Sequence, residues 1–192
     1  MITIFTQKIE YLSEDDKNKI INSLSEDAQA RLNKKRNEKL YLASLCALSL
    51  LTNEQKGDLS YRDNGAPFFK TINSDISISH STTYVAVAIS SSKEEPIGID
   101  IEEDLPKEKS FPFSRFLTES EQKQLKSGTP YIKIWTKKEA LYKYLKDNNT
   151  PFIKLDSTSI EEHKAKFITL QIENNTLTVC AKNNAIIKLI QQ

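Results

Sequence analysis

Three strand-like runs follow one another closely in the middle of the sequence, and they constrain the fold more than any other feature. They are DISIS at 75–79, YVAVAIS at 84–90 and IGIDIE at 97–102. Connections this short favour antiparallel neighbours, because a parallel pair needs a long crossover between its strands. Further strand-like runs occur at 2–6, 151–155, 166–173, 177–182 and 185–190. Antiparallel sheet is therefore expected in both halves of the chain.

Helical patterns separate these strands. Residues 13–51 are expected to be mostly helical, with a solvated charged part that runs into the apolar stretch 40–51. Thr118 and Glu121 form the capping-box pattern that opens a helix, and Gly128 is expected to stop it. A second helix is predicted from Pro130 to about Lys146. Strands and helices in both halves predict an α+β fold.

Composition excludes several classes of protein. The 192 residues contain 27 Lys and Arg against 26 Asp and Glu, so bulk charge does not favour nucleic acid. The longest apolar run has twelve residues, fewer than the ~20 that span a bilayer, and the N-terminus lacks a secretory pattern. Cys46 and Cys180 sit in apolar surroundings and are expected to be buried, reduced thiols. A cytoplasmic enzyme or binding domain is the expected class.

Two acidic side chains share one face of the strand at 97–102. Asp100 and Glu102 are two residues apart, while Ile99 and Ile101 can anchor the other face in the core. Two carboxylates so close repel each other unless a cation lies between them, and oxygen ligands suit Mg²⁺, with Mn²⁺ as an alternative. In that case both acids would converge at a surface cleft. An ordinary amphipathic strand with a solvated acidic face is the other interpretation.

Glu139 and Lys143 are four residues apart in the predicted helix WTKKEALYK, and therefore share a helix face. One interpretation is an ordinary surface ion pair. In the other, Glu139 is a third carboxylate that faces the strand acids, and Lys143 beside it supplies positive charge for phosphate. His80 follows a strand between Ser79 and Ser81. That position suits a phosphate contact, although a lone histidine is more often structural.

A modest basic patch lies in the charged part of the predicted helical region 13–51. It contains Arg31, Lys34, Lys35, Arg36 and Lys39. The patch is either a solvated helix surface or a site for a multiply charged anion.

These segments together resemble the 4′-phosphopantetheinyl transferase superfamily. The signature of that family is a G-[IV]-D-[IV]-E strand followed by a W-[ST]-x-K-E-A-x-x-K helix. The chain has GIDIE at 98–102 and WTKKEALYK at 135–143, with ISISHS upstream at 76–81. The resemblance is carried best by residues 25–145, and it includes the NGAP turn at 64–67.

The resemblance implies a reaction in which the phosphopantetheine arm of coenzyme A moves to a serine of an apo acyl, peptidyl or aryl carrier protein. Adenosine 3′,5′-bisphosphate is the by-product. Asp100, Glu102 and Glu139 would hold Mg²⁺, or Mn²⁺, at the pyrophosphate. Asp100, Glu139 and Lys143 would be the catalytic residues, with Glu139 as general base and Lys143 stabilising the pyrophosphate or the leaving oxygen.

The resemblance also implies how coenzyme A is held. His80, with Ser79 beside it, would contact the 3′-phosphate. Lys39, and with less support Lys34 and Arg31, would add positive charge there. The family often has a lysine that contacts phosphate at the position of Ala66, which lacks that group. Either coenzyme A is then expected to bind more weakly, or a neighbour such as Arg62 or Lys70 is expected to compensate.

The length is similar to that of the longer, Sfp-type members, in which two similar halves form a pseudo-dimer in one chain. Residues 1–92 would then be a half that contributes to coenzyme A binding. Residues 93–192 would carry the metal-binding and catalytic motifs. A monomer is expected, with no nucleic-acid or membrane partner.

The apo carrier protein is expected to dock on the irregular segment Lys107–Phe116. Lys107, Lys109 and Arg115 would steer an acidic partner, and Phe111 or Phe113 would be an exposed anchor. Packing of both rings onto the core is the alternative. Two other functions stay open: a different Mg²⁺-dependent phosphohydrolase, and a non-catalytic binding module of the same fold.

Overall fold

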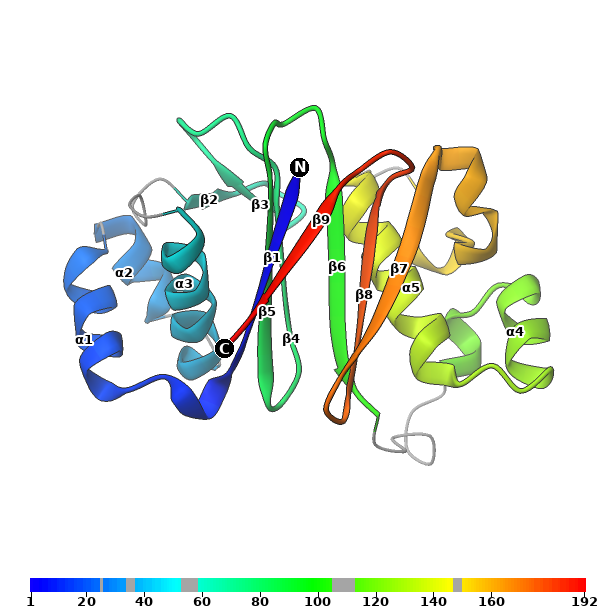
Figure 1. The fold of residues 1–192 in the computed structure, drawn as a ribbon, viewed down its shortest axis with the longest axis horizontal. Coiled ribbons are helices and arrows are strands. Elements are labelled where there is room, and N and C mark those ends of the chain that lie inside the picture. The colour runs from blue at the N-terminus through cyan, green and yellow to red at the C-terminus, as the bar shows by residue number, and fades with distance from the viewer. Residues whose placement is uncertain (25, 34–36, 53–58, 105–112, 147–149) are drawn as a thin grey trace.

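The computed structural model describes residues 1–24, 26–33, 37–52, 59–104, 113–146 and 150–192, without the side chains of residues 27, 28, 31, 113 and 114. The fold is α+β, as predicted (Figure 1). The strands are β1 (Ile2–Lys8), β2 (Leu59–Tyr61), β3 (Pro67–Phe69), β4 (Ile76–His80), β5 (Tyr84–Ser90), β6 (Ile97–Glu103), β7 (Ala165–Ile172), β8 (Asn175–Lys182) and β9 (Ile187–Gln191). The α-helices are α1 (Glu14–Ser23), α2 (Glu26–Leu32), α3 (Glu38–Thr52), α4 (Glu119–Lys126) and α5 (Tyr131–Leu145). The 3₁₀ helices are η1 (Ile9–Tyr11), η4 (Phe113–Phe116), η5 (Phe152–Lys154) and η6 (Ser157–His163).

Two main sheets pack against each other in the centre of the molecule (Figure 1). The first has the strand order β4-β5-β1-β9 and the second β6-β8-β7, while β2 and β3 form a small hairpin. Neighbouring strands are antiparallel except β1 and β9, which are parallel. The last strand of the chain therefore completes the sheet built by the first half.

The two sheets face each other across an apolar layer. In β5, Val85 and Val87 join the core beneath α3, whereas Ala86 and Ala88 point toward the second sheet. Because side chains of a strand alternate between its faces, one strand serves both layers. The inter-sheet cluster also contains Ile2, Ile4, Tyr84, Ile97, Ile99, Ile101, Ile172, Leu177, Val179 and Ala181. The layers run α3, first sheet, second sheet, α5.

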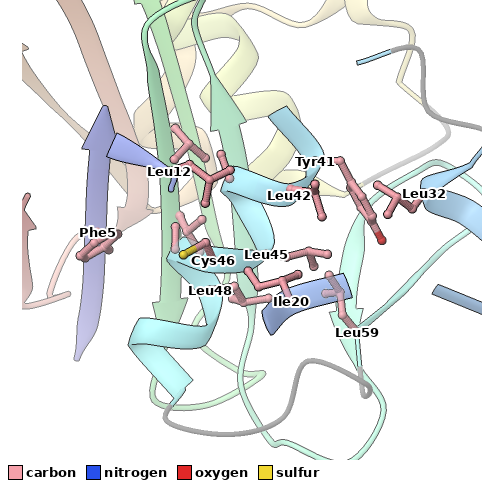
Figure 2. Packing of buried hydrophobic residues seen from close by; sticks show 14 of the residues in the cluster. Phe5, Leu12, Ile20, Leu32, Tyr41, Leu42, Leu45, Cys46, Leu48 and Leu59 are labelled. Atoms are coloured by element: carbon pink, nitrogen blue, oxygen red, sulfur yellow. The ribbon is translucent and has the colours of Figure 1, made fainter. Parts of the chain in front are cut away.

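The apolar stretch that the sequence places at 40–51 forms most of α3. Leu42, Leu45 and Leu48 are almost completely buried, and Figure 2 shows them between α1 and the first sheet. Cys46 lies in the same cluster. Both cysteines are free and buried, which confirms the prediction of reduced thiols.

One strand prediction is wrong. Residues 152–154 form the 3₁₀ helix η5 instead, capped by Pro151 and Leu155. The ring of Phe152 packs edge-on against Trp135 and Tyr142 of α5, with centroids 5.5 Å apart in each pair. Docking on α5 therefore favours a tight turn over an extended strand in this segment.

A buried ion pair fixes α4, α5 and the segment before η6 relative to one another. Lys138 Nζ lies 2.8 Å from Glu121 Oε2, and both side chains are fully buried. Glu121 Oε2 also accepts the Thr118 N–H, which completes the predicted capping box. Its other oxygen accepts hydrogen bonds from Ser157, and Lys138 also donates to the Leu155 carbonyl. Such pairing is what makes two buried charges tolerable.

Side chains of β4 connect the two sheets at their shared edge. Every second residue from 75 to 79 is polar, and each accepts a hydrogen bond from a backbone N–H of β6. The pairs are Asp75 with Ile97 at 2.9 Å, Ser77 with Ile99 at 3.0 Å and Ser79 with Ile101 at 3.4 Å. The polar alternation therefore satisfies N–H groups of β6 that would otherwise be buried without partners.

Candidate functional site

A glycine brings α5 against β6. A Cβ atom at Gly98 would lie 1.9 Å from the carbonyl oxygen of Ala140 and 2.5 Å from the backbone nitrogen of Tyr144. Only a residue without a side chain allows the helix so close to the strand. This contact places Glu139 and Lys143 of α5 on the side of β6 that carries Asp100.

Three polar side chains from three elements meet at this point. Lys143 Nζ lies 2.8 Å from Asp100 Oδ1 and 3.0 Å from Ser79 Oγ, and Ser79 Oγ donates to Asp100 Oδ1 at 2.7 Å. Asp100 is 4% exposed, so the acid is buried, which contradicts the alternative of a solvated acidic face. Asp100 Oδ2 is also buried, and no described residue is its hydrogen-bond partner. One acceptor of the cluster is thus left for a further group.

Ser79 has a full set of protein partners. It donates to Asp100 and accepts from Lys143 and from the Ile101 N–H. These contacts give Ser79 a positioning role for Asp100 and Lys143.

Glu139 is half-buried next to this cluster. Burial raises its pKa to about 7, and the negative charges of Asp100 and Glu102 act in the same direction, while Lys143 opposes them. The helix and the strand thus bring three carboxylates within electrostatic reach of one another. A carboxylate with this pKa exchanges its proton near neutral pH, which suits a general base.

Glu139→Gln is expected to change how stability depends on pH. The pKa of Glu139 is about 4.5 when unfolded and about 7 when folded. The folded state therefore binds the proton more tightly, and the wild type loses stability as pH rises from about 4.5 to above 7. In chelator, the stability of Glu139→Gln relative to wild type should rise by up to about 3 kcal/mol between pH 4.5 and pH 8, at 1.36 kcal/mol for each pKa unit.

Urea unfolding at both pH values measures this difference. Glu162→Gln, at an exposed carboxylate, is the control. The same relative stability of Glu139→Gln at both pH values would show that burial does not perturb Glu139.

The described residues do not form a ready metal centre. Among them, no group of three or more His, Cys, Asp or Glu side chains is arranged to hold a metal ion. Lys143 neutralises Asp100 instead. The donor chemistry nevertheless fits a hard cation, because Asp100 Oδ2 is an unused buried acceptor and Glu102 and Glu139 add carboxylate charge nearby.

A cavity of about 200 Å³ extends from this cluster along α5. One wall is helical, the second is the β4 edge and the third is the turn of the β2–β3 hairpin. The lining residues are Asn64, Gly65, Ala66, Pro67, Ile76, Ser77, Ile78, Glu139, Tyr142, Lys143 and Lys146. Ala66, where the resemblance expects a lysine, therefore faces the same space as Glu139 and Lys143.

His80 ends β4 with an exposed side chain. Nearby protein atoms, which desolvate part of the ring, and the charge of Lys143 lower its pKa, and Asp100 opposes this effect. Thr82 and Thr83, in the turn that follows, line a second cavity of about 520 Å³ together with Lys39. Lys39 and the turn after His80 thus border one cavity. Lys34 and the side chain of Arg31 lie outside the described residues.

Most of the predicted docking segment also lies outside the described residues, namely 105–112, which include Lys107, Lys109 and Phe111. Residues 113–116 form η4, in which Arg115 is exposed. The ring of Phe116 packs edge-on against Trp135, with centroids 6.3 Å apart. This end of the segment is therefore attached to α5.

Two residues of the site were not singled out from the sequence. Asp75 and Lys146 form an ion pair at the far end of the cavity along α5. The alternation of polar residues at 75, 77 and 79 was a usable signal, because polar side chains on one face of an otherwise apolar strand need partners. No comparable sequence signal marks Lys146.

Comparison with known proteins gives one family. Residues 96–188 match the model of the 4′-phosphopantetheinyl transferase superfamily, just under half of the chain. The match contains both the GIDIE strand and the WTKKEALYK helix. This is a family of transferases that use coenzyme A and carrier proteins. No curated protein matches the chain. Among the described residues, no helix is long and apolar enough to cross a membrane.

Proposed function

We propose that this chain is a 4′-phosphopantetheinyl transferase, which moves the phosphopantetheine group of coenzyme A to a serine of an apo carrier protein. The observation that carries the proposal is the meeting of Asp100, Glu139 and Lys143 beside a cavity, within the segment that matches this superfamily. A carboxylate base, an ammonium group and a buried acidic acceptor are the groups that phosphoryl-group transfer needs.

The chemistry assigns a task to each group. The carrier serine oxygen attacks the phosphorus that bears pantetheine, the bond to the bridging pyrophosphate oxygen breaks, and adenosine 3′,5′-bisphosphate leaves with the electron pair. Glu139 accepts the serine proton, which its pKa of about 7 allows at neutral pH. Lys143 Nζ, at the cavity wall, donates hydrogen bonds to the phosphate oxygens on which charge accumulates.

Asp100, Glu102 and Glu139 would hold Mg²⁺, with Mn²⁺ as the alternative, and Asp100 Oδ2 is the acceptor available for it. When bound, the ion would supply positive charge for the pyrophosphate. Ser79 and Lys143 hold Asp100 Oδ1 and so fix the direction of Oδ2. His80 and Lys39 would bind the 3′-phosphate, together with Lys34 and Arg31.

The pseudo-dimer of two halves belongs to the same proposal. Each half has a sheet covered by a 15-residue helix, α3 in one and α5 in the other. The halves would be 1–92 and 93–192, apart from β9, which joins the first sheet. A monomeric, cytoplasmic enzyme is proposed, in keeping with two buried free cysteines, and segment 107–116 is proposed to contact the carrier.

Incubation with coenzyme A, Mg²⁺ and a panel of apo carriers tests the function. Intact mass spectrometry should show one added phosphopantetheine group on a carrier and none on the same carrier with its serine changed to alanine. Release of phosphate or pantetheine phosphate to water without carrier labelling would instead support a phosphohydrolase. Binding of coenzyme A with neither product would support a non-catalytic module.

A further inference from the structure

We propose that Lys146 binds the 5′-phosphate at the adenosine end of coenzyme A in the cavity along α5, apart from the 3′-phosphate that His80 and Lys39 would hold. The inference rests on the proposed function for the identity of the ligand. It is independent of the metal ligands, because Lys146 lies on the part of the cavity wall that is furthest along α5 from Glu139.

The backbone at Lys146 is in an unfavourable conformation for lysine. Lys146 is the C-terminal cap of α5, with φ 50° and ψ 21°, which is the left-handed region. Glycine is the usual residue there, because a Cβ atom makes that conformation costly. The contacts around Lys146 must therefore hold it in this conformation.

The conformation places the ammonium group of Lys146 at the β4 edge. Lys146 Nζ forms an ion pair with Asp75 and donates to the Ile76 carbonyl at 3.3 Å, while Asn64 Nδ2 donates to the Lys146 carbonyl at 3.4 Å. The side chain of Lys146 is 15% exposed. The lysine is therefore held from the strand side and from the hairpin side, at a fixed place on the cavity wall.

The cavity suits a nucleotide that carries phosphate. Lys143 of α5 and Lys146, the cap that follows the helix, both line the cavity, so it has two ammonium groups on this side. Pro67, Ile78 and the ring of Tyr142 add apolar surface. Ala66, on the hairpin wall, adds no charge, so Lys146 is the cation that this chain provides in addition to the catalytic lysine.

Lys164 provides a matched control. It is also a lysine in the left-handed region, with φ 51°, at the C-terminal cap of η6. Its side chain is exposed, and it does not line the cavity. Lys164→Gly therefore removes the same charge and relieves the same type of backbone strain, away from the ligand.

The probe is adenosine 3′,5′-bisphosphate, whose binding to the full chain is measured by calorimetry. Lys146→Gly is expected to raise its Kd about tenfold, the effect of losing roughly one ionic contact, whereas Lys164→Gly leaves Kd unchanged. Lys146→Asn, which tolerates the left-handed region, should behave like Lys146→Gly. Ala66→Lys in the Lys146→Gly background should restore affinity by placing an ammonium group on the opposite wall.

A double variant separates direct binding of phosphate by Lys146 from an indirect effect through Asp75. Without Lys146, the charge of Asp75 could repel the phosphate by itself. Asp75→Asn combined with Lys146→Gly removes that charge and keeps an oxygen for the Ile97 N–H, so Kd should stay raised. Recovery of wild-type affinity in this double variant would overturn the proposal, because Lys146 would only neutralise Asp75.

A wild-type Kd in both Lys146 variants, together with a lower Tm, would also overturn the proposal and leave Lys146 a purely structural ion-pair partner. Failure of the proposed function has a different signature, because wild-type protein would then label no carrier. A wild type that labels carriers together with Lys146 variants that bind the probe normally refutes this inference alone.

Discussion

Asp100→Asn is expected to lower the rate of phosphopantetheine transfer by about a thousandfold or more, because it removes the charge on which the electrostatics of the site depend. The substitution keeps the shape of the side chain and an oxygen for Ser79 and Lys143. It leaves Lys143 without its counter-ion and removes the carboxylate oxygen proposed to bind the cation. The measurement is kcat/KM for an apo carrier at saturating coenzyme A and Mg²⁺.

Asp104→Asn is the control, because Asp104 is an exposed aspartate that follows β6 and bonds to Thr176 away from the site. A second readout does not depend on turnover. Mg²⁺ should raise the Tm of the wild type and of Asp104→Asn, but not that of Asp100→Asn. Normal transfer by Asp100→Asn in excess chelator would refute both the metal assignment and the role of Asp100.

Gly98→Ala is expected to lower the free energy of unfolding by about 4 kcal/mol or more, because the added methyl group would severely overpack the contact between α5 and β6. The new methyl group would meet the Ala140 carbonyl oxygen at 1.9 Å, and a helix backbone cannot rotate out of the way as a side chain can. To fold, α5 would have to move off β6, which would also separate Lys143 from Asp100.

Gly128→Ala is the comparison. Gly128 has φ +97° and nothing within 4 Å of an added Cβ atom, so its substitution costs only backbone strain, roughly 1–2 kcal/mol. Urea unfolding gives both values. If Gly98→Ala were no more destabilising than Gly128→Ala, close contact between α5 and β6 would not hold the site together.

The sequence predicted the elements of the site better than their environment. The alternation with Asp100 and Glu102 correctly placed Ile99 and Ile101 in the core, since alternation is a local property of a strand. The same spacing did not show that Asp100 is buried against Lys143. Burial depends on the approach of α5, and the Gly98 contact that permits it joins residues about forty positions apart.

In segment 151–155, by contrast, the sequence predicted the wrong element because tertiary packing overrode the local preference. The apolar composition of this segment favours a strand, but aromatic packing of Phe152 on α5 decides for a 3₁₀ helix. Short apolar runs are ambiguous for this reason, because the partner surface and not the run itself selects the conformation.

By itself, the sequence determined most of the helices and strands, the α+β class and the motif residues, because periodicity, caps and turns act over a few neighbouring residues. Only the tertiary structure decided which groups meet. In the folded protein, the side chains of Asp75, Ser77 and Ser79 accept hydrogen bonds from N–H groups of β6. The tertiary structure also brought Lys146 to the cavity in a left-handed cap. Hydrogen bonds and ion pairs between distant segments form only where packing holds their partners within about 3 Å, a distance that no local pattern encodes.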